Sequence, residues 1–282
     1  MAIQLATDFK PYVDEIFTRE SKLSLLTNND FNFDGAKTVK IYKVKTVATT
    51  DYDRAGMGTG KTGSRYGEIK GIDTDIEEFT LSKDRSFTFA IDKLDEDETK
   101  QAVAGATALA RQLREVVVPE IDSYVYGKIV AGAGTTAAAA ALTADNIFDK
   151  ILTANNTLDD ADVPETKRVL VVTPTTYYLM KRSKDIVMET ETGQDMRLKG
   201  VIANLDGCAV VKVPAARLPE NFGFMVVHPS ATVAPVKLAD YRIHKDPPGI
   251  SGSLVEGRFY FDAFVLDNKK KAIYYQPLPA SE

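Results

Sequence analysis

The residues closest to a chemical motif lie at Ala55–Thr62, which reads Ala-Gly-Met-Gly-Thr-Gly-Lys-Thr. Except at Ala55, this matches the phosphate-binding loop, in which backbone amides hold phosphates, the lysine reaches the outer phosphates and the threonine holds magnesium. That chemistry also needs a strand before the loop and a helix after it. The residues that follow, Gly63–Gly67, do not favour a helix start. We therefore interpret the segment as a hairpin tip, and keep a nucleotide-binding enzyme that uses Lys61 and Thr62 as an alternative.

Other reactive residue types are scarce. Cys208, His228 and His244 are the only cysteine and histidines, so a metal site built from these types is not expected. No histidine-containing motif accompanies a serine or cysteine nucleophile. The acidic runs at 92–98 and 159–162 lack the spacing of a calcium loop. We expect no catalytic residue, no cofactor and no metal.

Composition excludes several classes of protein. The 282 residues carry 35 Lys plus Arg against 40 Asp plus Glu, a formal net charge of -5, and 44% are hydrophobic. These values are ordinary for a globular protein and disfavour a strongly basic nucleic-acid binder or a disordered chain. With one cysteine, no internal disulfide can form, so the fold depends on core burial. The first residues lack a basic segment followed by an apolar core, so no signal peptide is expected, and no apolar run approaches about 20 residues. We therefore expect synthesis in a cytoplasm and no membrane partner.

Two charged segments predict a long β-hairpin. The outgoing residues 37–47 are β-branched and lysine-rich, whereas residues 72–92 begin acidic and then alternate at Phe87, Phe89 and Ile91. An antiparallel ladder centred on Thr59 places three lysines opposite three acids, namely Lys40 with Glu78, Lys43 with Asp75 and Lys45 with Asp73. Opposite charges across a ladder favour this register. A ribbon polar on both faces must project into solvent or lie against another molecule.

A long helix is predicted over Glu96–Val130. Asp95 and Glu98 have capping-box spacing. One apolar stripe follows, and the helix would be about 50 Å long at 1.5 Å per residue. Pro119 removes a backbone donor, so we expect a kink near Glu115. Such a helix is too long for a compact core and suggests a strut along a flat molecule.

The remaining segments predict a helix at the start and an α/β pattern after a hinge at Gly132–Leu142. Expected helices cover Pro11–Leu26, Asp145–Leu158 and Pro174–Arg182. Expected strands cover Arg168–Val172, a stretch near Val201, Cys208–Val213 and Gly223–Val227, followed by a terminal hairpin of Phe259–Leu266 with Ala272–Tyr275.

The order of these parts resembles the major capsid protein of tailed bacteriophages, the Hong Kong 97-like shell subunit. The run Gly257–Leu266 followed by Ile273–Tyr275 is also similar to the last strands of such proteins. The resemblance implies an α+β fold with five parts. They are an N-terminal arm (1–36), an extended β-hairpin loop (37–92), the spine helix of the peripheral domain with the hinge (93–142), an α/β axial domain (143–255) and a C-terminal hairpin returning to the peripheral domain (256–282).

The same resemblance implies a function. Subunits of this family assemble as hexamers and pentamers into an icosahedral shell around double-stranded DNA. The implied partners are copies of the chain, a separate scaffolding protein, a portal, and DNA on the inner surface of a virion capsid made in the bacterial cytoplasm. The expected inter-subunit contacts are the charged hairpin residues Lys40, Lys43, Lys45, Arg54, Lys61, Arg65, Asp73, Asp75 and Glu78. An encapsulin, a bacterial shell that packages enzymes, remains the alternative within this architecture.

Overall fold

The computed structural model describes residues 21–28, 38–52, 54, 65–66, 69–94, 105–183 and 204–280. The chain divides into two compact units. The smaller unit is Phe33–Leu81, and the larger unit combines Met1–Asn32 with Ser82–Glu282. Each unit is described by itself.

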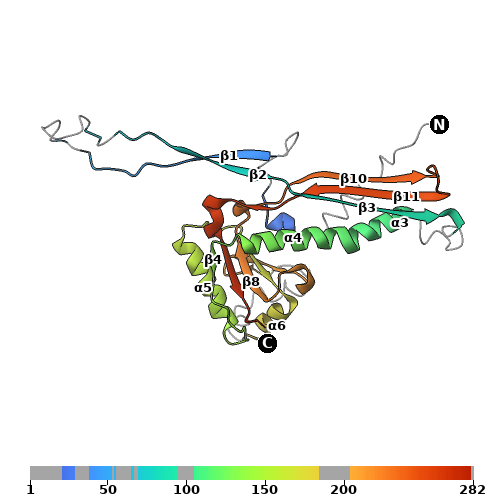
Figure 1. Ribbon diagram of the computed structural model, residues 1–282. Helices are drawn as coiled ribbons and strands as arrows, with labels where there is room; N and C mark the ends of the chain where they lie inside the picture. Colours follow the sequence, from blue (N-terminus) through green and yellow to red (C-terminus); the bar gives the residue numbers. More distant parts are fainter. Residues whose placement is uncertain are drawn as a thin grey trace. The chain divides into compact units, whose positions relative to one another are not determined.

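The smaller unit is a two-stranded antiparallel hairpin, drawn in blue and cyan in Figure 1. Strand β1 (Thr38–Val44) pairs with β2 (Thr74–Thr80), and Lys40 faces Glu78 while Lys43 faces Asp75. Beyond β1, the Lys45 amide donates to the Asp73 carbonyl oxygen at 3.0 Å. The predicted register is confirmed. A slip by one residue would move every side chain to the other face and separate the opposed charges.

The larger unit contains a three-stranded antiparallel sheet in the order β10–β11–β3. Its strands are β10 (Val236–Lys245), β11 (Gly252–Phe261) and β3 (Lys83–Asp92). The hairpin predicted over 37–92 is therefore wrong beyond Thr80, since 83–92 pairs with β11. The alternation at Phe87, Phe89 and Ile91 correctly marks a strand with one inward face, but such alternation does not identify the pairing partner.

A long helix runs beside this sheet (Figure 1). It consists of α3 (Gly105–Gln112), a π-helical turn η2 (Leu113–Val117) and α4 (Val118–Ala131), while the predicted start at 95–104 lies outside the described residues. Pro119 has no N–H to donate to the carbonyl of Glu115, and the helix changes to π geometry over that turn. The kink expected near Glu115 stays a prediction, and what the structure shows at that position is a π-helical turn. The side chains that face the core are fully buried: Leu109, Leu113, Val117, Ile121 and Val125.

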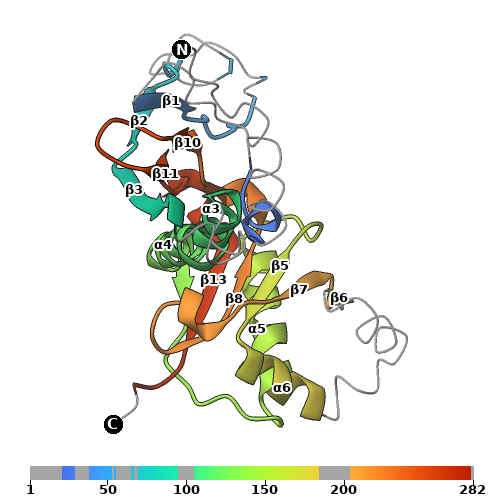
Figure 2. The same ribbon diagram turned by 90° about the vertical axis from the view of Figure 1, so that its right-hand side faces the viewer.

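A mixed six-stranded sheet forms the rest of the larger unit, with α5 (Ile147–Asp160) and α6 (Pro174–Arg182) beside it (Figure 2). In sheet order, the strands are β4 (Thr135–Thr136), β13 (Ile273–Pro277), β8 (Phe222–Val227), β5 (Val169–Val172), β7 (Cys208–Lys212) and β6 (Asn204–Leu205). Every residue of β5 and β8 is buried, as expected for central strands with apolar residues on both faces.

The predicted C-terminal hairpin (256–282) is wrong. Strand β11 lies in the three-stranded sheet, whereas β13 pairs antiparallel with β8. Between them, β12 (Phe264–Val265) pairs with β9 (Thr232–Val233), and a 3-10 helix, η5 (Asp267–Ala272), replaces the expected turn. The predicted end of the axial domain at residue 255 is also wrong, because β10, which precedes it, and β11, which spans it, pair in the same three-stranded sheet. Residues 273–275 are buried, so a central position in the larger sheet covers them better than a two-stranded hairpin would.

Short 3-10 turns complete the described chain: η1 (Leu23–Leu25), η3 (Ala215–Arg217) and η4 (Pro229–Ala231). Of the helix predicted over Pro11–Leu26, residues 11–20 lie outside the described part, and Leu23–Leu25 is a single 3-10 turn. Val201, near which a strand was predicted, also lies outside the described part.

Candidate subunit-contact surfaces

The hairpin carries a ladder of ion pairs. Lys40 Nζ lies 2.5 Å from Glu78 Oε1, directly across the ladder, and the hydrogen bond between them raises the pKa of Lys40. On the opposite face the pairs are diagonal: Lys43 Nζ lies 2.8 Å from Glu77 Oε2, and Lys45 Nζ lies 3.2 Å from Asp75 Oδ2. Lysine side chains lean along a twisted strand. Each of these two lysines therefore reaches the acid two residues beyond the one directly opposite, on the same face of the hairpin. Lysines of one strand pair with acids of the other, as predicted. The partners of Lys43 and Lys45, however, are Glu77 and Asp75 rather than the directly opposite acids.

Apolar side chains share the face of Lys40. Tyr42 faces Ile76 across the ladder, with 66% and 52% of their surfaces exposed, and the adjacent Val44 is 63% exposed. Side chains at even positions on both strands point to this one face. A contiguous exposed apolar group next to ion pairs is typical of a surface that another protein covers. The charges of this hairpin were predicted from the sequence, but its apolar face was not.

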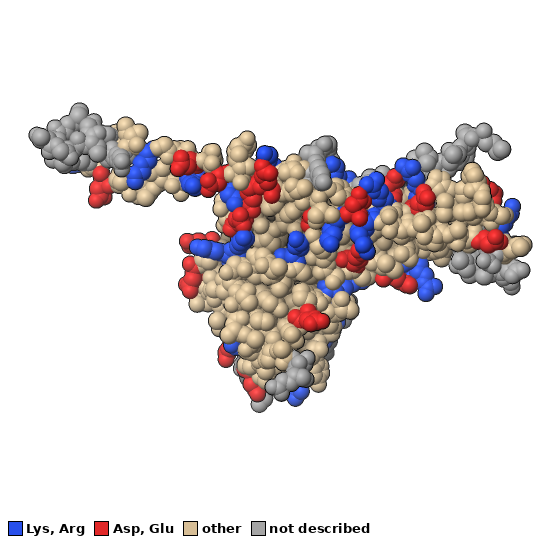
Figure 3. Space-filling model, in the orientation of Figure 1, with Lys and Arg blue, Asp and Glu red and all other residues tan. Residues whose placement is uncertain are grey.

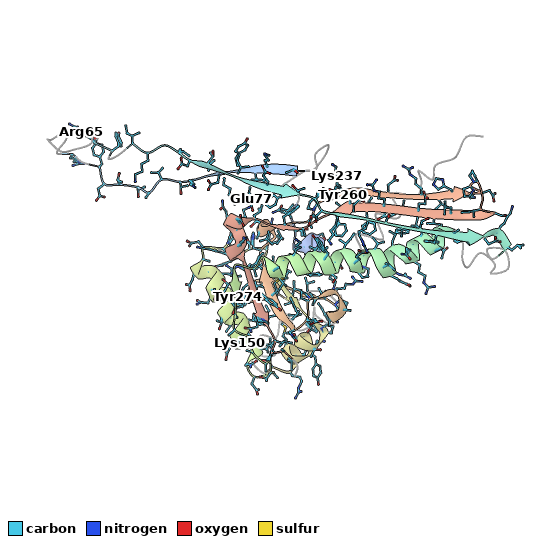
Figure 4. All side chains as sticks on the ribbon, in the orientation of Figure 1. Arg65, Glu77, Lys150, Lys237, Tyr260 and Tyr274 are labelled. Carbon is cyan, nitrogen blue, oxygen red and sulfur yellow. The ribbon has the colours of Figure 1, made fainter. Side chains whose placement is uncertain are left out.

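Near the tip the two arms of the hairpin meet through aromatic residues. The rings of Tyr52 and Tyr66 lie edge to face with centroids 5.0 Å apart, and Thr50 Oγ1 donates to the Tyr66 carbonyl oxygen at 2.9 Å. Arg54 and Arg65 are both exposed here, and Arg65 lies at the end of the unit in Figure 4. Lys61 and the phosphate-loop-like residues 55–62 lie outside the described residues.

Where the chain leaves the hairpin, Asp262 joins three elements of the larger unit. Its carboxylate accepts hydrogen bonds from the Ser82 amide at 2.8 Å, the Ser82 hydroxyl at 2.7 Å and the Tyr124 hydroxyl at 2.8 Å. Ser82 directly precedes β3, Tyr124 lies on α4, and Asp262 follows β11. The ammonium groups of Lys83 and Lys128 lie 5.0 and 5.5 Å from the Tyr124 ring centroid, within cation–π range. No local pattern in the sequence predicts this cluster, because its three residues lie far apart along the chain.

The outward face of the three-stranded sheet is charged but balanced. Arg258 pairs with Asp84 through two contacts of 2.6 and 3.0 Å, and this lowers the pKa of Asp84. Arg242 lies 2.7 Å from Asp240, and His244 Nε2 lies 3.3 Å from Glu256. In Figure 3, acidic and basic side chains are mixed over this region rather than gathered by sign. Such a face suits a protein partner with matched charges better than a polyanion.

The described residues offer no assembled reactive centre. Within them, no three His, Cys, Asp or Glu side chains come together to hold a metal ion. Burial raises the pKa of the Cys208 thiol to about 11, and Asn155 Oδ1 accepts its hydrogen bond at 3.3 Å. His228 pairs through Nδ1 with the Ser230 hydroxyl, and burial lowers its pKa. In the part of the chain that is described, no helix combines the length and apolarity required to cross a bilayer.

Comparison with known proteins gives the family. A model of the phage capsid protein family matches residues 76–276, well over half of the chain. No curated protein matches the sequence.

Among solved structures, the chain is similar to one from Mycobacterium phage Che8, with 21% identity and a TM-score of 0.65 over 89% of each chain. It is also similar to the mature capsid of bacteriophage PhiM1, with 15% identity and a TM-score of 0.66 over 88% of this chain and 84% of the other. A virus-like particle from Pyrococcus furiosus gives 13% identity and a TM-score of 0.56 over 95% and 97%. At these identities the structures establish the fold, which is Hong Kong 97-like. Together with the family match, they show that the chain belongs to the phage capsid protein family, as a structural, shell-forming subunit.

Proposed function

We propose that this chain is the major capsid protein of a tailed phage and assembles as hexamers and pentamers into an icosahedral shell that encloses double-stranded DNA. The observation that carries the proposal is the β1–β2 hairpin, a separate unit with ion pairs and an apolar face that includes Tyr42 and Ile76. An isolated two-stranded hairpin is marginally stable in water, so this unit needs a surface to lie on. A neighbouring copy of the chain supplies that surface in a shell.

The larger unit fits two roles within such a shell. We assign α3, α4 and the three-stranded sheet to the peripheral domain, and the six-stranded sheet with α5 and α6 to the axial domain. Residues 1–36 would be the arm, and the hairpin charges from Lys40 to Glu78, with Arg54, Lys61 and Arg65, would make the inter-subunit contacts. The long continuous helix, which is buried along one side, supports the first assignment.

The partners beyond the chain itself are a scaffolding protein, a portal and the packaged DNA, and the subunit would be made in the host cytoplasm before it enters the virion. The balanced charge on the three-stranded sheet and the net charge of -5 support a container that does not grip its genome. No observation favours the encapsulin alternative.

Electron microscopy of the purified, concentrated chain tests the proposal, since rings or spherical particles are visible directly. Particles larger than single subunits are expected, either from the chain alone or on addition of its scaffolding protein. A chain that stays monomeric under both conditions and binds ATP through Lys61 would contradict it.

A further inference from the structure

A cavity of about 310 Å³ in the larger unit gathers positive charge. It is lined by the residue before η1, by α4, by the start of α6, and by the end of β7 with the segment that leads into η3: Lys22, Asp122, Tyr126, Pro174, Lys212, Val213, Pro214 and Arg217. Three of these side chains are cationic and one is acidic. Neither the Asp262 cluster nor the hairpin contributes to it.

The single acid of the cavity is already satisfied. Asp122 is buried, and its two carboxylate oxygens accept hydrogen bonds from the Ser21 hydroxyl at 2.7 Å and from Arg217 Nη1 at 2.9 Å. Burial raises the pKa of Asp122, and these two hydrogen bonds oppose the rise. Arg217 and Asp122 therefore neutralise each other.

The two lysines are not neutralised in this way. Lys22 Nζ donates to the Lys212 carbonyl oxygen at 3.0 Å, and the Lys212 ammonium lies 5.3 Å from the Tyr177 ring centroid. Neither lysine forms an ion pair with an acid among the described residues. Burial, together with the nearby charges of Lys212 and Arg217, lowers the pKa of Lys22. A concave site with unpaired like charges attracts an anion.

Tyr126 adds an independent sign of a missing partner. Its side chain lines the cavity, yet its buried hydroxyl has no hydrogen-bond partner in the described structure. Buried hydroxyls are normally hydrogen-bonded, and an unpaired one calls for a partner such as water or an ion. Tyr126 and the cationic residues Lys22, Lys212 and Arg217 thus line one cavity.

We propose that this cavity binds an oxyanion, held by Lys22 and Lys212 and flanked by Arg217 and Tyr126. Lysine ammonium groups suit such a ligand because each presents three donors and a compact charge. The oxyanion has two possible sources, a free phosphate ion or a carboxylate side chain of a neighbouring copy. The second source rests on the proposed shell function, and the first does not.

The first arm of the test uses the full, unassembled chain. Inorganic phosphate is titrated against sodium chloride at equal ionic strength, and binding is followed by calorimetry and by the thermal midpoint. We expect phosphate to raise the midpoint, and Lys22→Gln or Lys212→Gln to weaken phosphate binding about tenfold each, since each removes one charge-assisted contact. Lys181→Gln is the matched control, because Lys181 lies 4.9 Å from the same Tyr177 ring but does not line the cavity.

The second arm uses assembled particles. When a neighbour's carboxylate is the ligand, the Lys22→Gln, Lys212→Gln double variant keeps the thermal midpoint of the single chain but yields fewer or less stable shells, and added phosphate weakens wild-type shells. The proposal is overturned when phosphate acts no differently from chloride and the double variant assembles like the wild type. Should the wild type fail to assemble both alone and with its scaffolding protein, the proposed shell function fails, and the phosphate titration alone decides the cavity.

Discussion

Lys43 Nζ lies 2.8 Å from the carboxylate of Glu77. The residue directly opposite Lys43 in the β1–β2 ladder is Asp75, so the ion pair with Glu77 is diagonal. The side chains of this pair are 18% and 12% exposed, whereas those of Lys40 and Glu78 are 57% and 52% exposed. Water and salt screen an exposed pair far more than a covered one. The two ion pairs of one hairpin should therefore differ in strength.

Double-mutant cycles test this difference. For Lys43→Gln and Glu77→Gln we expect a coupling energy of about 1 kcal/mol, the upper end for cross-strand pairs. For Lys40→Gln and Glu78→Gln we expect a smaller coupling that disappears in about 1 M salt. Amide hydrogen exchange in β1 and β2 measures both cycles. Equal couplings, or a Lys43–Glu77 coupling that salt removes, would contradict the interpretation.

The hairpin tip should be needed for assembly but not for folding. Deleting residues 56–67 is expected to lower the yield of particles seen by electron microscopy, because the tip would lose its contact with a neighbour. The circular dichroism spectrum and thermal midpoint of the single chain should stay near wild type, since these residues lie in the smaller unit. Lys61→Ala is the control. We expect neither the wild type nor this variant to bind ATP. Normal shells after the deletion would count against the proposed role.

Asp262 should stabilise the larger unit where the chain leaves the hairpin. Asp262→Ala leaves the Ser82 amide and the Tyr124 hydroxyl without their acceptor, and we expect a loss of about 1–3 kcal/mol in the free energy of unfolding. Tyr124→Phe removes one hydrogen bond and should cost about 0.5–1.5 kcal/mol. Urea denaturation measures both, with Ser86→Ala on exposed β3 as the control. Wild-type stability in Asp262→Ala would show that the cluster does not hold these elements together.

Gly252 should be irreplaceable at the start of β11. Its φ is +142°, and a Cβ there would lie 2.1 Å from the Ile91 carbonyl oxygen, which belongs to the backbone and cannot move aside. Gly252→Ala is expected to cost about 2–4 kcal/mol.

Gly127 in α4 gives the matched comparison, because a Cβ there meets nothing within 4 Å. Gly127→Ala should be neutral or stabilising by up to about 1 kcal/mol, as expected for a helix interior. Thermal denaturation compares the two substitutions. A Gly252→Ala variant as stable as Gly127→Ala would refute the close approach of β11 to Ile91.

Cys208 should be inert in the folded chain. Burial raises its pKa from 9.0 to about 11. Between these two pH values the thiol stays protonated in the folded chain but is deprotonated in the unfolded chain. Its contribution to stability is therefore complete below pH 9 and falls as the pH rises toward 11. Alkylation at about pH 8 should be slow in buffer and fast in urea, where this single cysteine reports global unfolding.

Cys208→Ala is the control for the pH dependence, because other groups also titrate above pH 9. The difference in stability between wild type and Cys208→Ala should shrink between pH 9 and about 11. Rapid alkylation of the native chain would show that the thiol is accessible and would contradict its buried position.

Local patterns in the sequence predicted several of the elements and one register, but not the long strand β10. The alternation along 38–44 and 74–80, with lysines opposite acids, predicts each β1–β2 pair, because a slip by one residue would exchange the two faces of the hairpin. Pro119 marks the place where the long helix departs from α geometry, since its missing N–H leaves the carbonyl four residues earlier without its usual donor; the expected form was a kink, and the structure has a π-helical turn. The order of these elements is also sufficient to suggest a capsid fold.

Tertiary structure alone decided which strands pair and which side chains meet. β3 pairs with β11 rather than extending the hairpin, and β13 pairs with β8 rather than with β11, because strand partners are chosen by long-range burial that alternation does not encode. The ion-pairing charges of the hairpin could be predicted from the sequence, because the lysines and the acids lie on two strands that pair in a regular ladder. The cavity that we propose to bind an oxyanion could not be predicted from the sequence, because Lys22 and Lys212 lie 190 positions apart and only the fold brings both to its lining.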